Sequence, residues 1–298
     1  MKKTVIYSIS VCLFSWAVLE LAYALISQTT LAGRLLMQLI SLMYMFLPMA
    51  VALVMQWIRK EKPAGTKLLN FNFSPVWLIA IAVPFAVLLL SLLFSILVPG
   101  ARLHYGPENI IAFQGLEGEA ADTVTAQFSS MSPAMMIIST LIGGVFAGCT
   151  INAVAAFGEE YGWRNYMVDA LRGEKFWKTA LIIGLVWGIW HAPLILRGHN
   201  YPQHPVAGVA MMCVFCLLFG ALELYFVLKT KSVIPAALMH GTLNAIAGAS
   251  LMLIQGGNDL TVGMTGACGF AAIAIVLAAV WFYDSRHDKI MAGAVQSA

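Results

Sequence analysis

The sequence predicts an all-α fold, a polytopic bundle of transmembrane helices. Of its 298 residues, 60% are hydrophobic and only 10% are charged, and the mean hydropathy is +0.84. Soluble domains usually carry about a quarter charged residues. The apolar runs are continuous rather than alternating, which favours helices over a barrel, because a helix in lipid satisfies its own backbone hydrogen bonds. We therefore expect residues 1–298 to form a single membrane domain.

Eight apolar stretches are each long enough to cross a bilayer, which takes about 20 residues. They follow one another too closely to leave room for a separate soluble domain. The predicted spans are 5–26, 35–58, 76–98, 134–157, 179–196, 206–228, 233–254 and 262–283.

The basic residues predict the orientation of these spans, because cytoplasmic loops carry an excess of Lys and Arg. With both termini cytoplasmic, only Arg34, Arg102 and Arg197 fall outside. The net charge of +3 thus reflects topology and not a nucleic-acid partner. We expect a multi-pass protein of a bacterial cell membrane. The basic residues placed inside are Lys2, Lys3, Arg59, Lys60, Lys62, Lys67, Arg172, Lys175, Lys178, Lys229, Lys231, Arg286 and Lys289.

Two adjacent acids, Glu159 and Glu160, interrupt an otherwise apolar stretch. An acidic residue at the centre of a membrane helix costs roughly 2.5 to 3.5 kcal/mol, so it usually marks a functional site with a nearby partner. Glu160 can pair with Arg164 through i, i+4 spacing. Glu159 points about 100° away from its neighbour and is the carboxylate left for chemistry. The alternative is a purely structural charge cluster at a helix end.

Three further polar residues lie within the fifth and seventh predicted spans. His191 is in the fifth, and His240 and Asn244 share one face of the seventh through i, i+4 spacing. At about 1.5 Å per residue, they and Glu159 lie roughly 12 to 20 Å from the predicted cytoplasmic ends of their helices. We therefore expect one shared layer that opens, if at all, toward the cytoplasmic side. The alternatives are a histidine satisfied by a carbonyl group, and hydrogen bonding between helices.

These groups together predict amide hydrolysis. A carboxylate and an imidazole in a low-dielectric cavity, here Glu159 and His191, can activate water. A second imidazole and an amide, here His240 and Asn244, can donate hydrogen bonds to a developing oxyanion. One such donor contributes about 3 to 4 kcal/mol.

Three motifs in this order resemble the CPBP intramembrane protease family, which includes CAAX prenyl endopeptidases and abortive-infection-type proteins. They are Glu159-Glu160 with Arg164, Trp187 with His191, and His240 with Asn244. The resemblance covers residues 134–249, which we expect to form the catalytic core. It implies an intramembrane endopeptidase acting on membrane-associated peptides or proteins.

The resemblance also implies a role for each matched residue. Glu159 and His191 would activate the attacking water, and His240 and Asn244 would stabilise the oxyanion. Glu160 and Arg164 would hold the helix and site together. Trp187 stands where the family usually has Phe, which bears on the shape of the pocket more than on the mechanism.

No cofactor is predicted, although a zinc ion remains an alternative. Glu159, His191 and His240 could supply a His/His/Glu ligand set. The chain lacks a His-Glu-x-x-His helix, and an Asn at i+4 from His240 is a poor zinc ligand but a good oxyanion donor. We therefore favour a glutamate-type, metal-independent hydrolase.

Two other functional classes stay open. In an ion- or proton-coupled transporter, the same buried acids and imidazoles would relay protons or bind a cation. In a non-catalytic scaffold or immunity protein, the helices would be kept without the chemistry.

The remaining polar and small residues receive structural interpretations. We expect Glu223 to snorkel or pair near Lys229 at the cytoplasmic interface, and His199 and His204 to be solvated in an outer loop. Glycines four residues apart predict close contacts between helices. These pairs are Gly144 with Gly148, Gly158 with Gly162, and Gly184 with Gly188.

Overall fold

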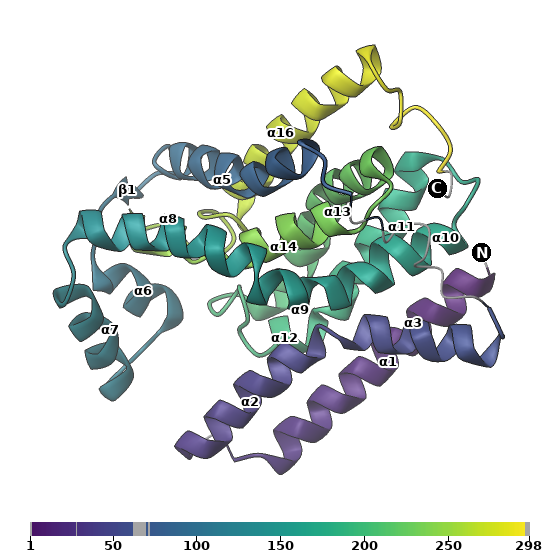
Figure 1. Cartoon of the computed structure of the whole chain (residues 1–298). Coiled ribbons are helices and arrows are strands. Elements are labelled where there is room, and N and C mark those ends of the chain that lie inside the picture. The colour runs from purple at the N-terminus through teal and green to yellow at the C-terminus, as the bar shows by residue number, and fades with distance from the viewer. Residues whose placement is uncertain (1, 28, 62–69, 71, 296–298) are drawn as a thin grey trace.

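The computed structural model describes residues 2–27, 29–61, 70 and 72–295, and its fold is all-α as predicted (Figure 1). The predicted inner residues Lys62 and Lys67 lie outside the described residues. The first helices are α1 (Lys2–Leu25), α2 (Leu31–Tyr44), α3 (Leu47–Ile58) and α5 (Val76–Ser95). After them come α6 (Pro107–Gln114), α7 (Glu119–Ser129), α8 (Pro133–Cys149), α9 (Ile151–Glu160), the π-helix η1 (Tyr161–Tyr166) and α10 (Met167–Ala170). The last are α11 (Phe176–Trp190), α12 (Ala192–Ile195), α13 (Pro205–Thr230), α14 (Ile234–Ile246), α15 (Ala249–Leu253) and α16 (Ala267–Arg286).

The described residues contain five apolar helical segments long enough to cross a membrane, or up to seven if two bent helix pairs each count as one span. One bent pair is α2 with α3, which meet at 47°, and the other is α7 with α8, which meet at 99°. The chain is thus an integral membrane protein with several apolar helices. The predicted number of eight spans stays a prediction.

Proline accounts for one of the bends. The predicted span 35–58 divides between Tyr44 and Leu47, and Pro48 occupies the first turn of α3. Proline is tolerated there because the N–H it lacks has no partner in the first turn of a helix. The span therefore restarts in a new direction at this point.

The segment that carries the two acids is continuous but irregular. The predicted span 134–157 breaks at Thr150, and α9 then passes into the wider π-helix η1 before α10 ends at Ala170. π-helical turns are rare and occur frequently at functional sites. Glu159 and Glu160 are thus the last two residues before the helix widens.

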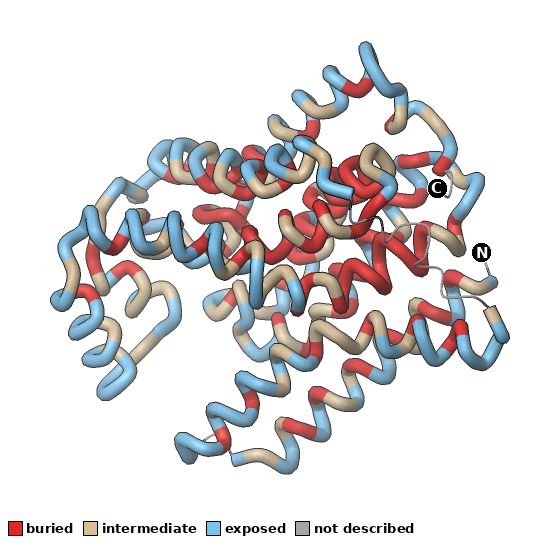
Figure 2. The backbone as a smooth tube through the Cα atoms, in the orientation of Figure 1, coloured by how far each residue is buried: buried red, intermediate tan, exposed pale blue. Residues whose placement is uncertain are grey.

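The most deeply buried backbone runs through the centre of the bundle, along α9, η1, α13 and α14 (Figure 2). Helices α1 to α3 lie on one side of this centre, and α5 and α16 lie on the other (Figure 1). Long apolar side chains such as Leu13, Leu89 and Ile142 are exposed on the outside, as expected for surfaces that face lipid.

Both ends of the described chain lie at the same end of the bundle (Figure 1). Lys3 pairs with Asp169 just after η1, and Val295 exchanges backbone hydrogen bonds with Gly173 and Glu174. Glu20, toward the far end of α1, pairs with Arg197 after α12. The connection after α12 therefore lies at the end opposite to the termini.

The predicted outer loop between the third and fourth spans contains helices and a short strand. It contains α6, α7 and the two-residue strand β1 (Arg102–Leu103), which pairs antiparallel with β2 (Ile254–Gln255). This pairing ties the loop to the segment after α15.

The glycine pairs mark close helix contacts, as predicted. A Cβ atom on Gly184 would lie 2.8 Å from Cα of Leu217, and one on Gly188 would lie 2.5 Å from Cα of Cys213. Helices α11 and α13 therefore pack backbone to backbone, which brings the chemistry of α11 next to the middle of α13.

We predict that Gly184→Ala destabilises the protein by about 1 to 3 kcal/mol, because the added methyl group overpacks this contact. Gly143→Ala is the matched control, since a Cβ there meets nothing within 4 Å. Thermal unfolding of both purified variants in detergent measures the difference. Equal melting temperatures for the two variants would contradict the packing described.

Candidate active site

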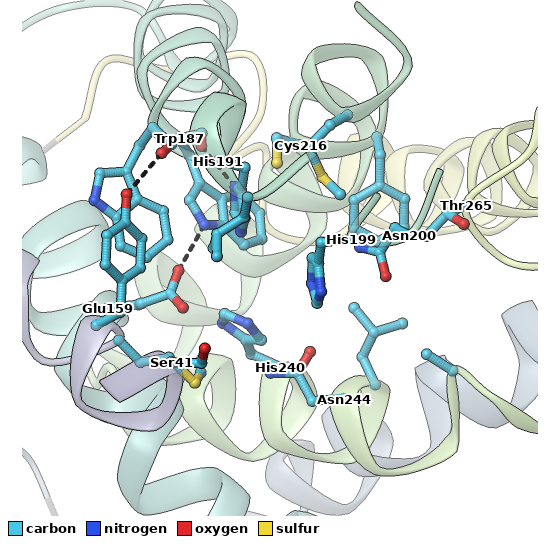
Figure 3. Close-up of a pocket in the computed structure, with 18 of the residues that line it drawn as sticks. Ser41, Glu159, Trp187, His191, His199, Asn200, Cys216, His240, Asn244 and Thr265 are labelled. Atoms are coloured by element: carbon cyan, nitrogen blue, oxygen red, sulfur yellow. Dashed lines mark hydrogen bonds between the residues drawn. The ribbon is translucent and has the colours of Figure 1, made fainter. Parts of the chain in front are cut away.

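A cavity of about 280 Å³ lies between α9, α11, α13 and α14. The four predicted catalytic residues all line it, and in Figure 3 their side chains point into it from three segments. The structure thus brings Glu159, His191, His240 and Asn244 together as the sequence predicted.

Glu159 is almost fully buried, with 2% of its surface exposed. One carboxylate oxygen, Oε2, accepts hydrogen bonds from the indole N–H of Trp187 at 2.7 Å and of Trp163 at 3.4 Å. These two donors fix the direction of the carboxylate and leave Oε1 for the cavity. A Phe at position 187 would lack this donor, so the Trp affects more than the shape of the pocket.

His191 lies at the break between α11 and α12. Pro193 has no N–H to continue the helical ladder, so the chain turns at this point. The ring Nδ1 of His191 lies 2.8 Å from the carbonyl oxygen of Trp187, which can only accept, so Nδ1 carries a proton. In the neutral form of this ring, Nε2 is the base that faces the cavity.

The break in α11 is held in place by two other helices. The carbonyl oxygen of Trp190 accepts hydrogen bonds from the hydroxyl of Tyr44 on α2 and from the indole N–H of Trp16 on α1, each at 3.1 Å. The N-terminal helices therefore help to set the position of His191.

A cluster of four buried charged or titratable groups lies beside the cavity. Arg164 Nη1 donates to Glu160 Oε1 at 3.1 Å, which confirms the predicted pair. His240 Nδ1 lies 2.9 Å from the same oxygen of Glu160, and Arg164 Nη2 pairs with Glu223 on α13. None of the four is more than 4% exposed. We call Glu160, Arg164, Glu223 and His240 the buried charge cluster.

Glu223 corrects the sequence analysis. It was expected at the membrane interface near Lys229, but its exposed fraction is zero and its partner is Arg164. That prediction was wrong because spacing along one helix does not reveal which neighbouring helix supplies a partner. The unusual cost of an acid in an apolar helix was the signal that could have pointed to it.

His199 also lines the cavity, together with Asn200 (Figure 3). The turn that carries them has positive φ at Gly198 (90°) and at Asn200 (61°), and it is anchored by the buried Tyr201, whose hydroxyl donates to the carbonyl of Thr265 at 2.7 Å. His204 of the same connection pairs with Asp259 at 2.6 Å. His199 is exposed and His204 keeps 41% of its side chain exposed, so both are accessible to solvent as predicted, although His204 is also paired.

The cavity reaches the end of the bundle opposite to the termini. His199, Asn200 and Thr265 belong to connections at or near that end, whereas the lining contains none of the described residues of the connections beside the termini. The predicted opening toward the cytoplasmic side stays a prediction.

The structure does not group the three residues of the zinc alternative, Glu159, His191 and His240, as one ligand set within the described residues. Within the described residues, one group of three potential ligands has its donor atoms within 4.8 Å of one another, and it is Glu160, Glu223 and His240. Arg164 already supplies the positive charge there, bound to both carboxylates. Glu159 directs one oxygen at two indole donors. Glu159, His191 and His240 do not form such a group among the described residues, and metal independence stays a prediction.

Comparison with known proteins agrees with the motifs. Residues 142–246 match the family model described as type II CAAX prenyl endopeptidase Rce1-like. The chain is also 29% identical over 140 residues to CAAX prenyl protease 2 of Methanococcus maripaludis. These matches confirm the resemblance to the CPBP family.

The Rce1-like segment, residues 142–246, lies inside the predicted core 134–249 and contains every residue of the three motifs. The match to the archaeal relative covers 45% of this chain and 48% of that protein, so the chain spans about half the length of the curated relative it matches. The helices before the Rce1-like segment include α1 and α2, whose side chains contact the break beside His191.

We predict that Arg164→Met destabilises the protein by about 3 to 5 kcal/mol, because it leaves Glu160 and Glu223 buried without their shared cation. Arg172→Met is the control, since Arg172 pairs with Asp169 at the surface and should contribute at most about 1 kcal/mol. Unfolding of both variants in detergent is measured as the loss of monodisperse protein. A tolerated Arg164→Met would contradict a cluster held by this guanidinium.

Proposed function

We propose that this protein is an intramembrane endopeptidase that hydrolyses peptide bonds of membrane-associated substrates. The observation that carries the proposal is the convergence of Glu159, His191, His240 and Asn244 on one cavity. The match of residues 142–246 to an endopeptidase family supports it.

In this mechanism, Glu159 and His191 bind and activate one water molecule. The water attacks the carbonyl carbon of the scissile bond, and its proton passes to Glu159. Glu159 then gives this proton to the leaving amine as the C–N bond breaks. The two indole donors on Oε2 keep Oε1 directed at the water during both transfers.

His240 and Asn244 stabilise the negative oxygen of the tetrahedral intermediate. When Nδ1–H of His240 is donated to the Glu160 carboxylate, the protonated ring offers its Nε2–H to the oxyanion. The amide N–H of Asn244, one turn further along α14, is the second donor. Donors fixed before the reaction need no reorganisation when charge develops on the oxygen.

The substrate is a peptide or protein segment delivered by the bilayer. The matching family and the archaeal relative are named for CAAX prenyl substrates, and a prenylated peptide is accordingly the first to test. The alternatives are a peptide pheromone, a bacteriocin or a segment of a membrane protein. We place the protein in a bacterial cell membrane, with eight spans and both termini cytoplasmic, as the distribution of Lys and Arg indicates.

We predict that Glu159→Gln abolishes cleavage, because an amide cannot accept the proton of the water. Asn244→Ala should lower kcat about 100- to 1,000-fold, the usual cost of one oxyanion donor. Reconstituted protein with fluorogenic peptides, each made with and without a farnesyl group, measures both variants. The proposal fails if both variants cleave like the wild type, and it also fails if the wild type cleaves nothing but moves ions in a Glu159-dependent way.

We predict that cleavage survives exhaustive chelation, because the hydrolase we propose uses Glu159 as its base and needs no metal. The assay compares purified protein before and after dialysis against EDTA and 1,10-phenanthroline, with elemental analysis of the same samples. Stoichiometric zinc together with activity that is lost on chelation and restored by zinc would establish the metal-dependent alternative.

A further inference from the structure

We propose that Glu223 is a positioning residue of this site, which orients the water-activating and the oxyanion-stabilising groups through Arg164. The proposal rests on the proposed endopeptidase function for its kinetic effect. Glu223 belongs to none of the three sequence motifs, and α13 carries none of the residues assigned to the reaction.

The burial of Glu223 needs an explanation. Its side chain has no exposed surface, although it lies within a 26-residue helix that is apolar enough to cross a membrane. A buried carboxylate is retained only where a cation compensates it, and Nη2 of Arg164 is that cation. The neighbouring turn of α13 is shaped for the guanidinium, because a Cβ on Gly220 would lie 2.8 Å from Nη2.

Arg164 connects Glu223 both to Glu159, which activates water, and to His240, which stabilises the oxyanion. On one side, Nη1 donates to Oε1 of Glu160, and that oxygen also binds Nδ1 of His240. On the other side, the guanidinium lies 4.2 Å from the ring centre of Trp187, whose N–H donates to Glu159. A displacement of Arg164 would therefore move the supports of Glu159 and His240 together.

Glu223 fixes the second arm of the guanidinium. Glu160 alone would bind Nη1 and leave the planar group free to rotate about that contact. A carboxylate on each Nη atom removes this freedom, since the fork of Arg is rigid.

The kinetic test compares Glu223→Gln with Glu20→Gln, which removes the charge from another Arg–Glu contact between segments, that of Glu20 with Arg197. Glu223→Gln should lower kcat about 10- to 100-fold, the loss seen when groups that orient metal ligands are removed. KM should stay within about 2-fold, because Glu223 does not line the cavity. Glu223→Asp, which keeps the charge, should retain more of kcat than Glu223→Gln.

A second variant displaces Arg164 without changing any charge. Gly220→Ala places a methyl group against Nη2, and Gly143→Ala, whose methyl group meets nothing, is its control. Gly220→Ala should also lower kcat at nearly unchanged KM. Normal kcat in Glu223→Gln and Gly220→Ala, at wild-type yield, would overturn the positioning role, as would a rise in KM that accounts for all of the lost kcat/KM.

A readout without substrate separates this inference from the proposed function. The ring signals of His240 in the NMR spectrum of 15N-histidine-labelled protein can be assigned by their loss in His240→Asn. They should shift in Glu223→Gln and in Gly220→Ala but not in Glu20→Gln. Shifted signals in a protein that cleaves nothing would keep the positioning role and end the peptidase proposal. Unchanged signals in an active protease would keep the peptidase proposal and end the positioning role.

Discussion

The structure depends on one guanidinium group buried inside a membrane protein. Arg164 has no exposed surface, and its contacts join η1 to α9, α11 and α13. Burying charges is costly and is offset only where each charge meets a partner in good geometry. The helices must therefore come together in the one arrangement that brings Glu160, Glu223 and Trp187 to Arg164. This same arrangement places Glu159 and His240 at the cavity.

Irregular backbone at several points of the chain positions residues that line the same cavity. The π-helical turn begins directly after Glu160, the break before Pro193 sets the position of His191, and the turn at Asn200 directs His199 inward. A break in a membrane helix is tolerated where other protein groups satisfy the freed backbone atoms. Tyr44 and Trp16 do so for the carbonyl oxygen of Trp190. The N-terminal helices, which lie outside the Rce1-like segment, thus support its geometry.

Sequence patterns predicted contacts within a helix better than contacts between helices. The pair of Glu160 with Arg164 follows from i, i+4 spacing, and the close approach of α11 to α13 follows from Gly184 and Gly188. The partner of Glu223 could not be predicted, because Arg164 lies 59 positions away in the sequence and on another helix. The depth estimates counted straight helices, so they could not include the breaks at Thr150 and His191.

The sequence by itself determined the all-α membrane class and the residue types available for hydrolysis. Composition decides whether segments enter lipid, and periodicity decides which residues share a helix face. Only the tertiary structure decided which groups meet: the two indole donors on Glu159, the shared oxygen of Glu160 between Arg164 and His240, and Glu223 as the second anchor of the guanidinium. The reason is physical, because these contacts depend on how bent helices pack and not on spacing along the chain.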